Sequence, residues 1–68
     1  MFEALKSWRL QRARADEVPA YVVFHNTTLE EIAARRPRSL AELASVPGIG
    51  PSKLARYGTE VLAALAEG

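Results

Sequence analysis

The residues best suited to bind a ligand lie in the stretch from Ser45 to Leu54, which reads SVPGIGPSKL. Pro51 has no N–H to donate and suits the first position of a helix, so we expect Gly50 to be the N-cap. Gly48 and Gly50 carry no Cβ, so an anion can approach the N–H groups that a helix start leaves unpaired. A nucleic-acid phosphate is such an anion. A tight turn that only joins two helices explains the same residues equally well.

Other side chains could extend such a site. Lys53 and Arg56 follow the turn and add positive charge. Tyr21 lies on one flank of an apolar stretch, where it could stack on a base or be a buried core tyrosine, two equally good alternatives. Arg35 and Arg38 come at the end of an earlier helix, where they could contact phosphates or simply complement the free carbonyls of that end.

Composition limits what the chain can do. It has 68 residues, enough for one domain, and a formal net charge of +1, so attraction to a polyanion must come from local clustering. It has no cysteine and one histidine, so we expect no metal site, and nothing in the sequence indicates a cofactor. We also expect no catalytic activity, because no carboxylate pair or nucleophile with a histidine is arranged for it.

The longest apolar runs, Ala20 to Phe24 and Val61 to Ala66, are far shorter than the ~20 residues that cross a bilayer. No signal peptide is recognisable. We therefore expect a cytoplasmic domain without membrane contact, associated with the nucleoid if the protein is bacterial.

The first half of the chain predicts one long helix and one short helical turn. A helix from Phe2 to about Ala15 is expected, with Arg9 on its apolar stripe. The stem of Arg9 should lie along the core while its guanidinium group finds a carboxylate or helix-end carbonyls. No second strand candidate exists to pair with the stretch Pro19 to Phe24, so we predict a short helical turn there with Val22, Val23 and Phe24 packed inward.

Capping patterns predict the third and fourth helices. Asn26 or Thr27 can cap the third helix, and Thr27 with Glu30 forms a possible capping box. This helix should end before Pro37. Ser39 and Glu42 form a second capping box, which starts a short helix whose apolar side is Leu40, Leu43 and Val46.

The last helix should run from Pro51 to about Ala66. Gly58 lies in the middle of its apolar stripe, which predicts close approach of a neighbouring helix. Arg56 and Glu60 are four residues apart and can pair. Taken together, these elements predict an all-α fold, a compact five-helix bundle in which one helix is very short.

Several of these stretches, in this order, resemble the HRDC domain, the "helicase and RNase D C-terminal" module. They are the Pro-x-Tyr-Val-Val-Phe at Pro19 to Phe24, the Thr-Leu at Thr28 and Leu29, the capped Glu-Leu at Glu42 and Leu43, and the Gly-Ile-Gly-x-x-Lys-Leu-x-x-Tyr-Gly from Gly48 to Gly58. The likeness spans essentially the whole chain. The turn by itself is also similar to a helix-hairpin-helix motif, which is much less specific.

The resemblance implies a non-catalytic auxiliary domain of a larger enzyme. The amino-acid sequence of the second element is closer to that of bacterial RecQ DNA helicases than to that of RNase D. Residues 1–68 would then form a single domain excised from a longer helicase chain, monomeric when isolated. Weak, sequence-independent contact with single-stranded or junction DNA is implied, through Tyr21, the turn at Gly48 and Gly50, and the basic residues Lys53 and Arg56.

Two other functions remain open. The near-neutral charge and the mixed-sign helix faces also suit a module that docks on the helicase core or on another protein. The family equally includes RNA-handling accessory domains of RNase D-type exonucleases.

The sequence also predicts that any nucleic-acid binding is weak. Ser52 occupies a position in the turn where a second basic residue would strengthen phosphate contact, so the binding should fade with salt.

Overall fold

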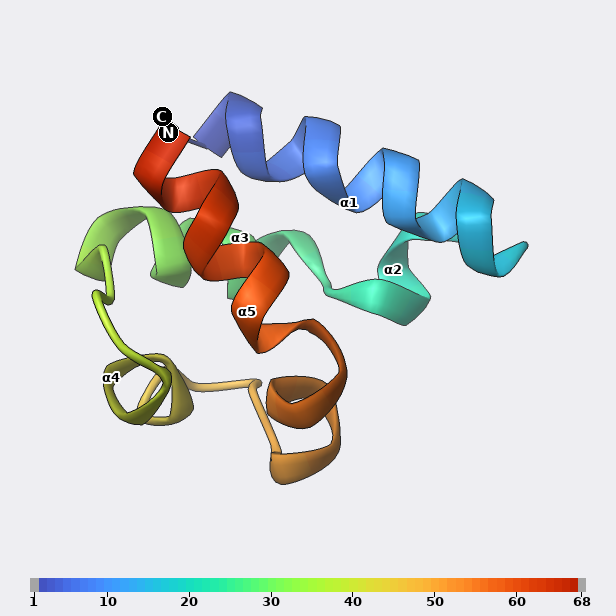
Figure 1. Cartoon of the computed structure of the whole chain (residues 1–68). Helices are drawn as coiled ribbons and strands as arrows, with labels where there is room; N and C mark the ends of the chain where they lie inside the picture. The colour runs from blue at the N-terminus through green and yellow to red at the C-terminus, as the bar shows by residue number, and fades with distance from the viewer. Residues whose placement is uncertain (1, 68) are drawn as a thin grey trace.

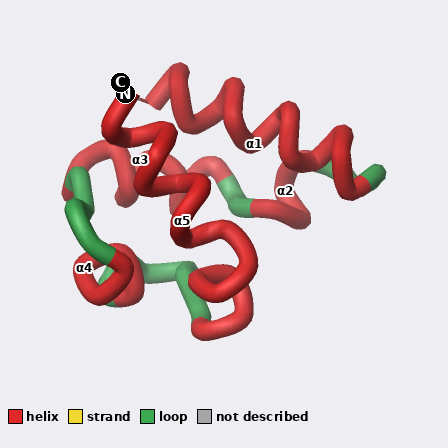
Figure 2. The backbone as a smooth tube through the Cα atoms, viewed as in Figure 1, coloured by secondary structure: helices red, strands yellow, loops and turns green. Residues whose placement is uncertain are grey.

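Five helices joined by short turns make up the fold in this computed structural model, which describes residues 2–67. They are α1 (Phe2–Asp16), α2 (Ala20–Val23), α3 (Asn26–Arg35), α4 (Leu40–Ala44) and α5 (Pro51–Glu67). Figure 2 shows that every regular element within this range is helical. The all-α, five-helix prediction is therefore confirmed, although α4 is nearly as short as α2.

The long helices α1 and α5 pack against each other and form one side of the molecule. In Figure 1 the start of α1 and the end of α5 lie next to each other, and α2 lies below the second half of α1. Helix α4 and the turn that leads into α5 lie at the opposite end of α5. This arrangement brings the start of α5 close to α2, although about thirty residues separate them in sequence.

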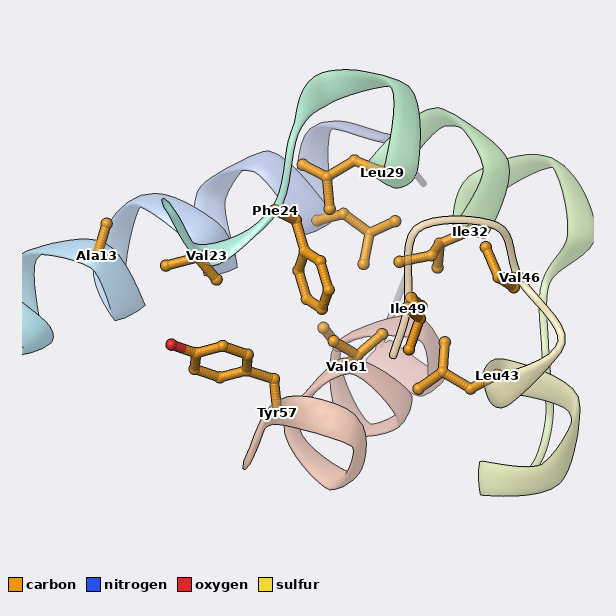
Figure 3. Close-up of a cluster of buried hydrophobic side chains, with 12 residues drawn as sticks. Ala13, Val23, Phe24, Leu29, Ile32, Leu43, Val46, Ile49, Tyr57 and Val61 are labelled. Carbon is orange, nitrogen blue, oxygen red and sulfur yellow. The ribbon is translucent and has the colours of Figure 1, made fainter. Parts of the chain in front are cut away.

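The core fills the space between these helices (Figure 3). Phe24 lies at its centre, because its ring packs against both Trp8, at 6.0 Å between centroids, and Tyr57, at 5.7 Å. The side chains that are completely or almost completely buried come from all five helices, the residue after α2 and the α4–α5 turn: Leu5, Ala13, Val23, Phe24, Leu29, Ile32, Leu43, Val46, Ile49, Tyr57, Val61 and Ala64. A single core to which every element contributes is expected for a chain that is too short to form two cores.

A left-handed residue ends α1 and turns the chain towards α2. Glu17 has a φ of 56°, and the N–H of Val18 donates to the carbonyl of Ala13 at 3.0 Å while the N–H of Glu17 donates to that of Arg14 at 3.2 Å. These two bonds form the Schellman arrangement that closes many helix ends. Pro19 follows at once and starts α2 beneath α1.

Two predictions for the short helices are wrong in part. Val22 was expected inside, but 40% of its surface is exposed. A helix of one turn has room for a single inner face, and here Val23 and the following Phe24 take it. Leu40 was expected on the buried side of α4, and its Cδ2 does lie close to Gly58 of α5, yet 46% of its surface is exposed.

The capping prediction for α3 is also wrong. The helix begins at Asn26, so His25 is the N-cap, and no side chain caps it. Thr27 is inside the first turn and cannot form the expected box with Glu30. The box at Ser39 is partly confirmed: its hydroxyl accepts from the N–H of Glu42 at 3.2 Å, while the Glu42 carboxylate accepts from the N–H of Arg38.

Gly58 and Gly48 both lie against close neighbours. A Cβ on Gly58 would lie 2.7 Å from Cδ2 of Leu40, so the predicted close approach is confirmed. Gly48 has a φ of 93°, and a Cβ there would overlap the hydroxyl oxygen of Thr28. Gly50 has nothing within 4 Å of the position that a Cβ would take.

We expect Gly48→Ala to lower the free energy of unfolding by about 2 kcal/mol, because both its backbone conformation and Thr28 oppose a side chain. Gly50→Ala is the matched control, and we expect a smaller loss, below about 1 kcal/mol, because a Cβ there meets no neighbour and only the preference of an N-cap for glycine over alanine is lost. Urea unfolding followed by circular dichroism measures both. Equal stability of the two variants would contradict this account of the turn.

Candidate nucleic-acid interface

The turn before α5 keeps two of its three central amides open. The N–H of Leu54 donates to the carbonyl of Gly50 at 2.9 Å, which confirms Gly50 as the N-cap. The N–H of Ile49 is used internally, since it donates to the carbonyl of Val46 at 3.2 Å. Within residues 2–67, the N–H groups of Gly48 and Gly50 make no hydrogen bond to another backbone group, and both glycines are exposed. These two N–H groups therefore have no backbone acceptor in the described part of the chain.

Lys53 is bound to the end of α2. Its Nζ donates to the carbonyl oxygen of Val22 and, at 2.7 Å, to that of Val23. The same ammonium group lies 5.6 Å from the ring centroid of Phe24 and 5.8 Å from that of Tyr57, distances typical of cation–π contacts. Carbonyls and rings stabilise the charge of Lys53 but do not neutralise it. Its role in binding a phosphate stays a prediction, since its geometry also has a structural explanation.

An open hollow of about 250 Å³ brings together three of the predicted site residues, Tyr21, Gly48 and Lys53. None of the described residues that line it is acidic. The complete lining is Tyr21, Val22, Val23, Phe24, His25, Thr28, Gly48 and Lys53. A negatively charged group would therefore meet no repelling carboxylate at this wall.

Tyr21 stands at the rim of this hollow. Its surface is 60% exposed, so the alternative of a buried core tyrosine is wrong. Its ring lies 5.9 Å from the His25 ring, with the two planes tilted by 32°. The exposed phenol ring is thus supported on one side by an imidazole and open to a ligand on the other.

Arg56 does not line the hollow. Its Nη2 lies 3.7 Å from Oδ2 of Asp16, and the side chain is 62% exposed. The predicted pair between Arg56 and Glu60 is wrong: the Glu60 carboxylate instead accepts from Nε1 of Trp8 at 3.2 Å and lies 3.5 Å from Nη1 of Arg12. Because α1 packs against α5, its side chains reach Glu60 from across the interface.

Arg35 and Arg38 are not brought to the same place. Nε of Arg35 forms an ion pair with Oε2 of Glu31 at 2.9 Å. In Figure 1 the end of α3, from which these arginines follow, lies on the opposite side of the molecule from α2. Phosphate contact by this pair would belong to a separate surface, and it stays a prediction.

Arg9 is a neighbour of the site that sequence reasoning treated as structural. Its Nη1 donates to the carbonyl of Phe24 at 2.9 Å, which confirms the expected helix-end partner. Its Nε is buried and makes no hydrogen bond, and none of the described carboxylates forms an ion pair with it. The feature of the sequence that points to Arg9 is the presence of a charged residue on an otherwise apolar helix stripe.

Two other kinds of site are not found in the part of the chain that the structure describes. No group of three or more potential metal-binding side chains occurs within residues 2–67. None of the helices in that range is sufficiently long and apolar to span a bilayer.

Comparison with known proteins identifies the fold. Residues 1–65 match the family described as "HRDC domain". The chain belongs to the HRDC family. HRDC domain 3 of the RecQ protein from D. radiodurans has the same structure, with a TM-score of 0.94 and 45% identity over 97% of this chain and 87% of that one.

The curated relatives of this HRDC domain are ATP-dependent DNA helicases. UvrD2 of Mycobacterium tuberculosis is 53% identical over 85% of the chain, and RecQ of Bacillus subtilis is 40% identical over 85%. RecQ of Haemophilus influenzae is 36% identical over 98%. The chain spans only 8% to 11% of the length of these three relatives. The likeness to RecQ is thus confirmed, UvrD2 is added to it, and the HRDC domain is an auxiliary, non-catalytic part of such helicases.

We expect Lys53→Met to lower the free energy of unfolding of the HRDC domain by about 1.5 kcal/mol, because it leaves two carbonyls of α2 without their charged donor. Arg56→Met is the matched control, since its exposed ion pair should contribute less than about 0.5 kcal/mol. Thermal and urea unfolding measure the two changes. A smaller loss for Lys53→Met than for Arg56→Met would show that Lys53 does not hold α2.

Proposed function

We propose that this HRDC domain is the accessory domain of a RecQ-type DNA helicase and binds single-stranded or junction DNA weakly and without sequence preference. The observation that supports this most is the exposed ring of Tyr21 at a hollow that also contains Gly48 and Lys53 and has no acidic lining among the described residues. A base needs a flat apolar face and a phosphate needs donors and positive charge, and here both lie side by side.

Each part of a nucleotide has a partner at this surface. A base stacks on the open face of Tyr21, a contact that tolerates any base because all bases have a π face. The phosphate next to it faces the free amides of Gly48 and Gly50 at the start of α5, where the helix dipole favours an anion. Lys53 adds a positive charge from the wall of the hollow. Arg56 acts from outside the hollow, through its charge alone.

Binding of this kind is weak and sensitive to salt. Lys53 is already bonded to two carbonyls, and the charge of Arg56 is partly offset by Asp16. Few phosphates are therefore neutralised. Each neutralised phosphate releases counterions, and added salt makes this release less favourable, so the affinity falls as the salt concentration rises. Such a domain adjusts how a helicase holds its DNA substrate, while the helicase core supplies most of the affinity for DNA.

Docking on the helicase core or on another protein is the main alternative. It is favoured by the distribution of charge away from the hollow, where Arg12, Asp16, Arg56 and Glu60 pair with one another and leave a mixed surface. A third alternative is RNA binding in an exonuclease, which a competition between DNA and RNA strands of matched sequence would separate from the first.

We expect Tyr21→Ala to weaken binding of a fluorescein-labelled oligothymidylate roughly tenfold at low salt, the loss of one stacked base. Tyr21→Phe keeps the ring and should bind like the wild type. Leu10→Ala is the matched control, because Leu10 is an exposed apolar residue on α1 that lines neither the hollow nor the turn. Fluorescence anisotropy measures all four proteins. No binding by the wild type at high micromolar concentration in low salt would refute the proposal and favour docking.

A further inference from the structure

A second hollow borders the first at Tyr21. It has a volume of about 450 Å³ and is lined by Arg9, Ala20, Tyr21, His25, Asn26 and Thr27. Tyr21 and His25 line both hollows, so this aromatic pair forms the ridge between them. As in the first hollow, no acidic side chain lines the second among the described residues.

Arg9 gives the second hollow an uncompensated positive charge. A half-buried guanidinium group is normally paired with a carboxylate, because taking a charge out of water is costly. Arg9 has instead one carbonyl partner, that of Phe24, and a buried Nε that makes no hydrogen bond. The half-buried Arg12 on the same helix also has a buried Nε without a hydrogen bond, but its guanidinium nitrogens lie 3.5 Å from carboxylate oxygens of both Asp16 and Glu60. The two arginines therefore differ in their charge, which is offset by carboxylates at Arg12 and by no described carboxylate at Arg9.

The start of α3 contributes donors to the same place. This helix has ten residues, and no side chain caps its first turn, which Asn26 and Thr27 begin. Its first N–H groups therefore have no side-chain partner and carry the positive end of the helix dipole. The side chains of Asn26 and Thr27 are exposed at the wall of the hollow and can donate as well.

We propose that this second hollow binds a second phosphate of the same strand, through Arg9 and the start of α3. The inference rests on the proposed function and extends it, since one stacked base on Tyr21 has a phosphate on each side. The backbone then passes from the amides of Gly48 and Gly50, across the ridge of Tyr21, to Arg9. The bound segment therefore contains at least two phosphates that the domain neutralises.

The direct variant, Arg9→Gln, also alters the bond that holds the Phe24 carbonyl and so can change stability. Thr27→Glu leaves Arg9 intact and separates the two effects. A carboxylate in the first turn of a helix is favourable for the fold, whereas it repels a phosphate bound there. Thr59→Glu is the matched control, because Thr59 is an exposed threonine on α5 that lines neither hollow.

The experiment titrates labelled oligothymidylate with the wild type, Thr27→Glu and Thr59→Glu at several KCl concentrations, and it records the thermal midpoint of each. We expect Thr27→Glu to bind about tenfold more weakly than Thr59→Glu, with an unchanged or higher midpoint. The slope of log K against log salt should become shallower by about 0.7, as for one lost phosphate on a single strand.

Two results would overturn the inference. If the wild type binds and Thr27→Glu has the affinity and salt slope of Thr59→Glu, the second phosphate site is refuted and the proposed function stands. If the wild type does not bind the strand at all, the proposed function itself fails, and the second site fails with it.

Discussion

The carbonyl end of α2 is held by two cations that come from two different helices. Lys53 of α5 donates to the carbonyls of Val22 and Val23, and Arg9 of α1 donates to that of Phe24. A helix of four residues cannot be stable alone, because forming the first helical turn is unfavourable and so short a helix adds almost no further hydrogen bonds to compensate. These bonds and the buried side chains of Val23 and Phe24 fix its position. The exposed ring of Tyr21 is placed by this arrangement, and so are the two hollows beside it.

The same bonds link structure to the proposed function. Carbonyl oxygens satisfy the donors of Arg9 and Lys53 but leave both net charges in place, whereas the other half-buried cation on α1, Arg12, is paired with carboxylates. The small overall charge of +1 therefore hides an uneven distribution. Positive charge remains around α2, and paired charges occupy the contact between α1 and α5. Local clustering can attract a polyanion where net charge would not.

Local signals in the sequence predicted most of the fold. Pro51 and Gly50 define the start of α5 through backbone chemistry alone, and the helical spacing of apolar residues located α1 and α5. Two errors have local causes. The length of α2 left only one inner face, so Val22 is outside, and α3 begins too early for Thr27 to be its cap. The resemblance to the HRDC domain supported the predicted number and order of the helices.

The pairing of charged side chains could not be predicted in the same way. Arg56 and Glu60 fit the spacing of a helical pair, but Asp16, brought from the end of α1, accepts from the hydroxyl of Tyr57 and lies near Arg56. Lys53 was expected only to add positive charge beside the turn, but it bonds to α2 from thirty residues away. Such partners depend on how distant elements pack, which spacing within one helix does not encode.

A titration of the ¹⁵N-labelled domain with oligothymidylate, followed by amide chemical shifts, tests the central claim most directly. The account predicts that the largest shifts occur in α2, at the start of α3 and in the turn from Gly48 to Lys53, on both sides of Tyr21. It would be contradicted if the largest shifts occurred instead along the groove between α1 and α5, around Trp8 and Ala64, with α2 unaffected.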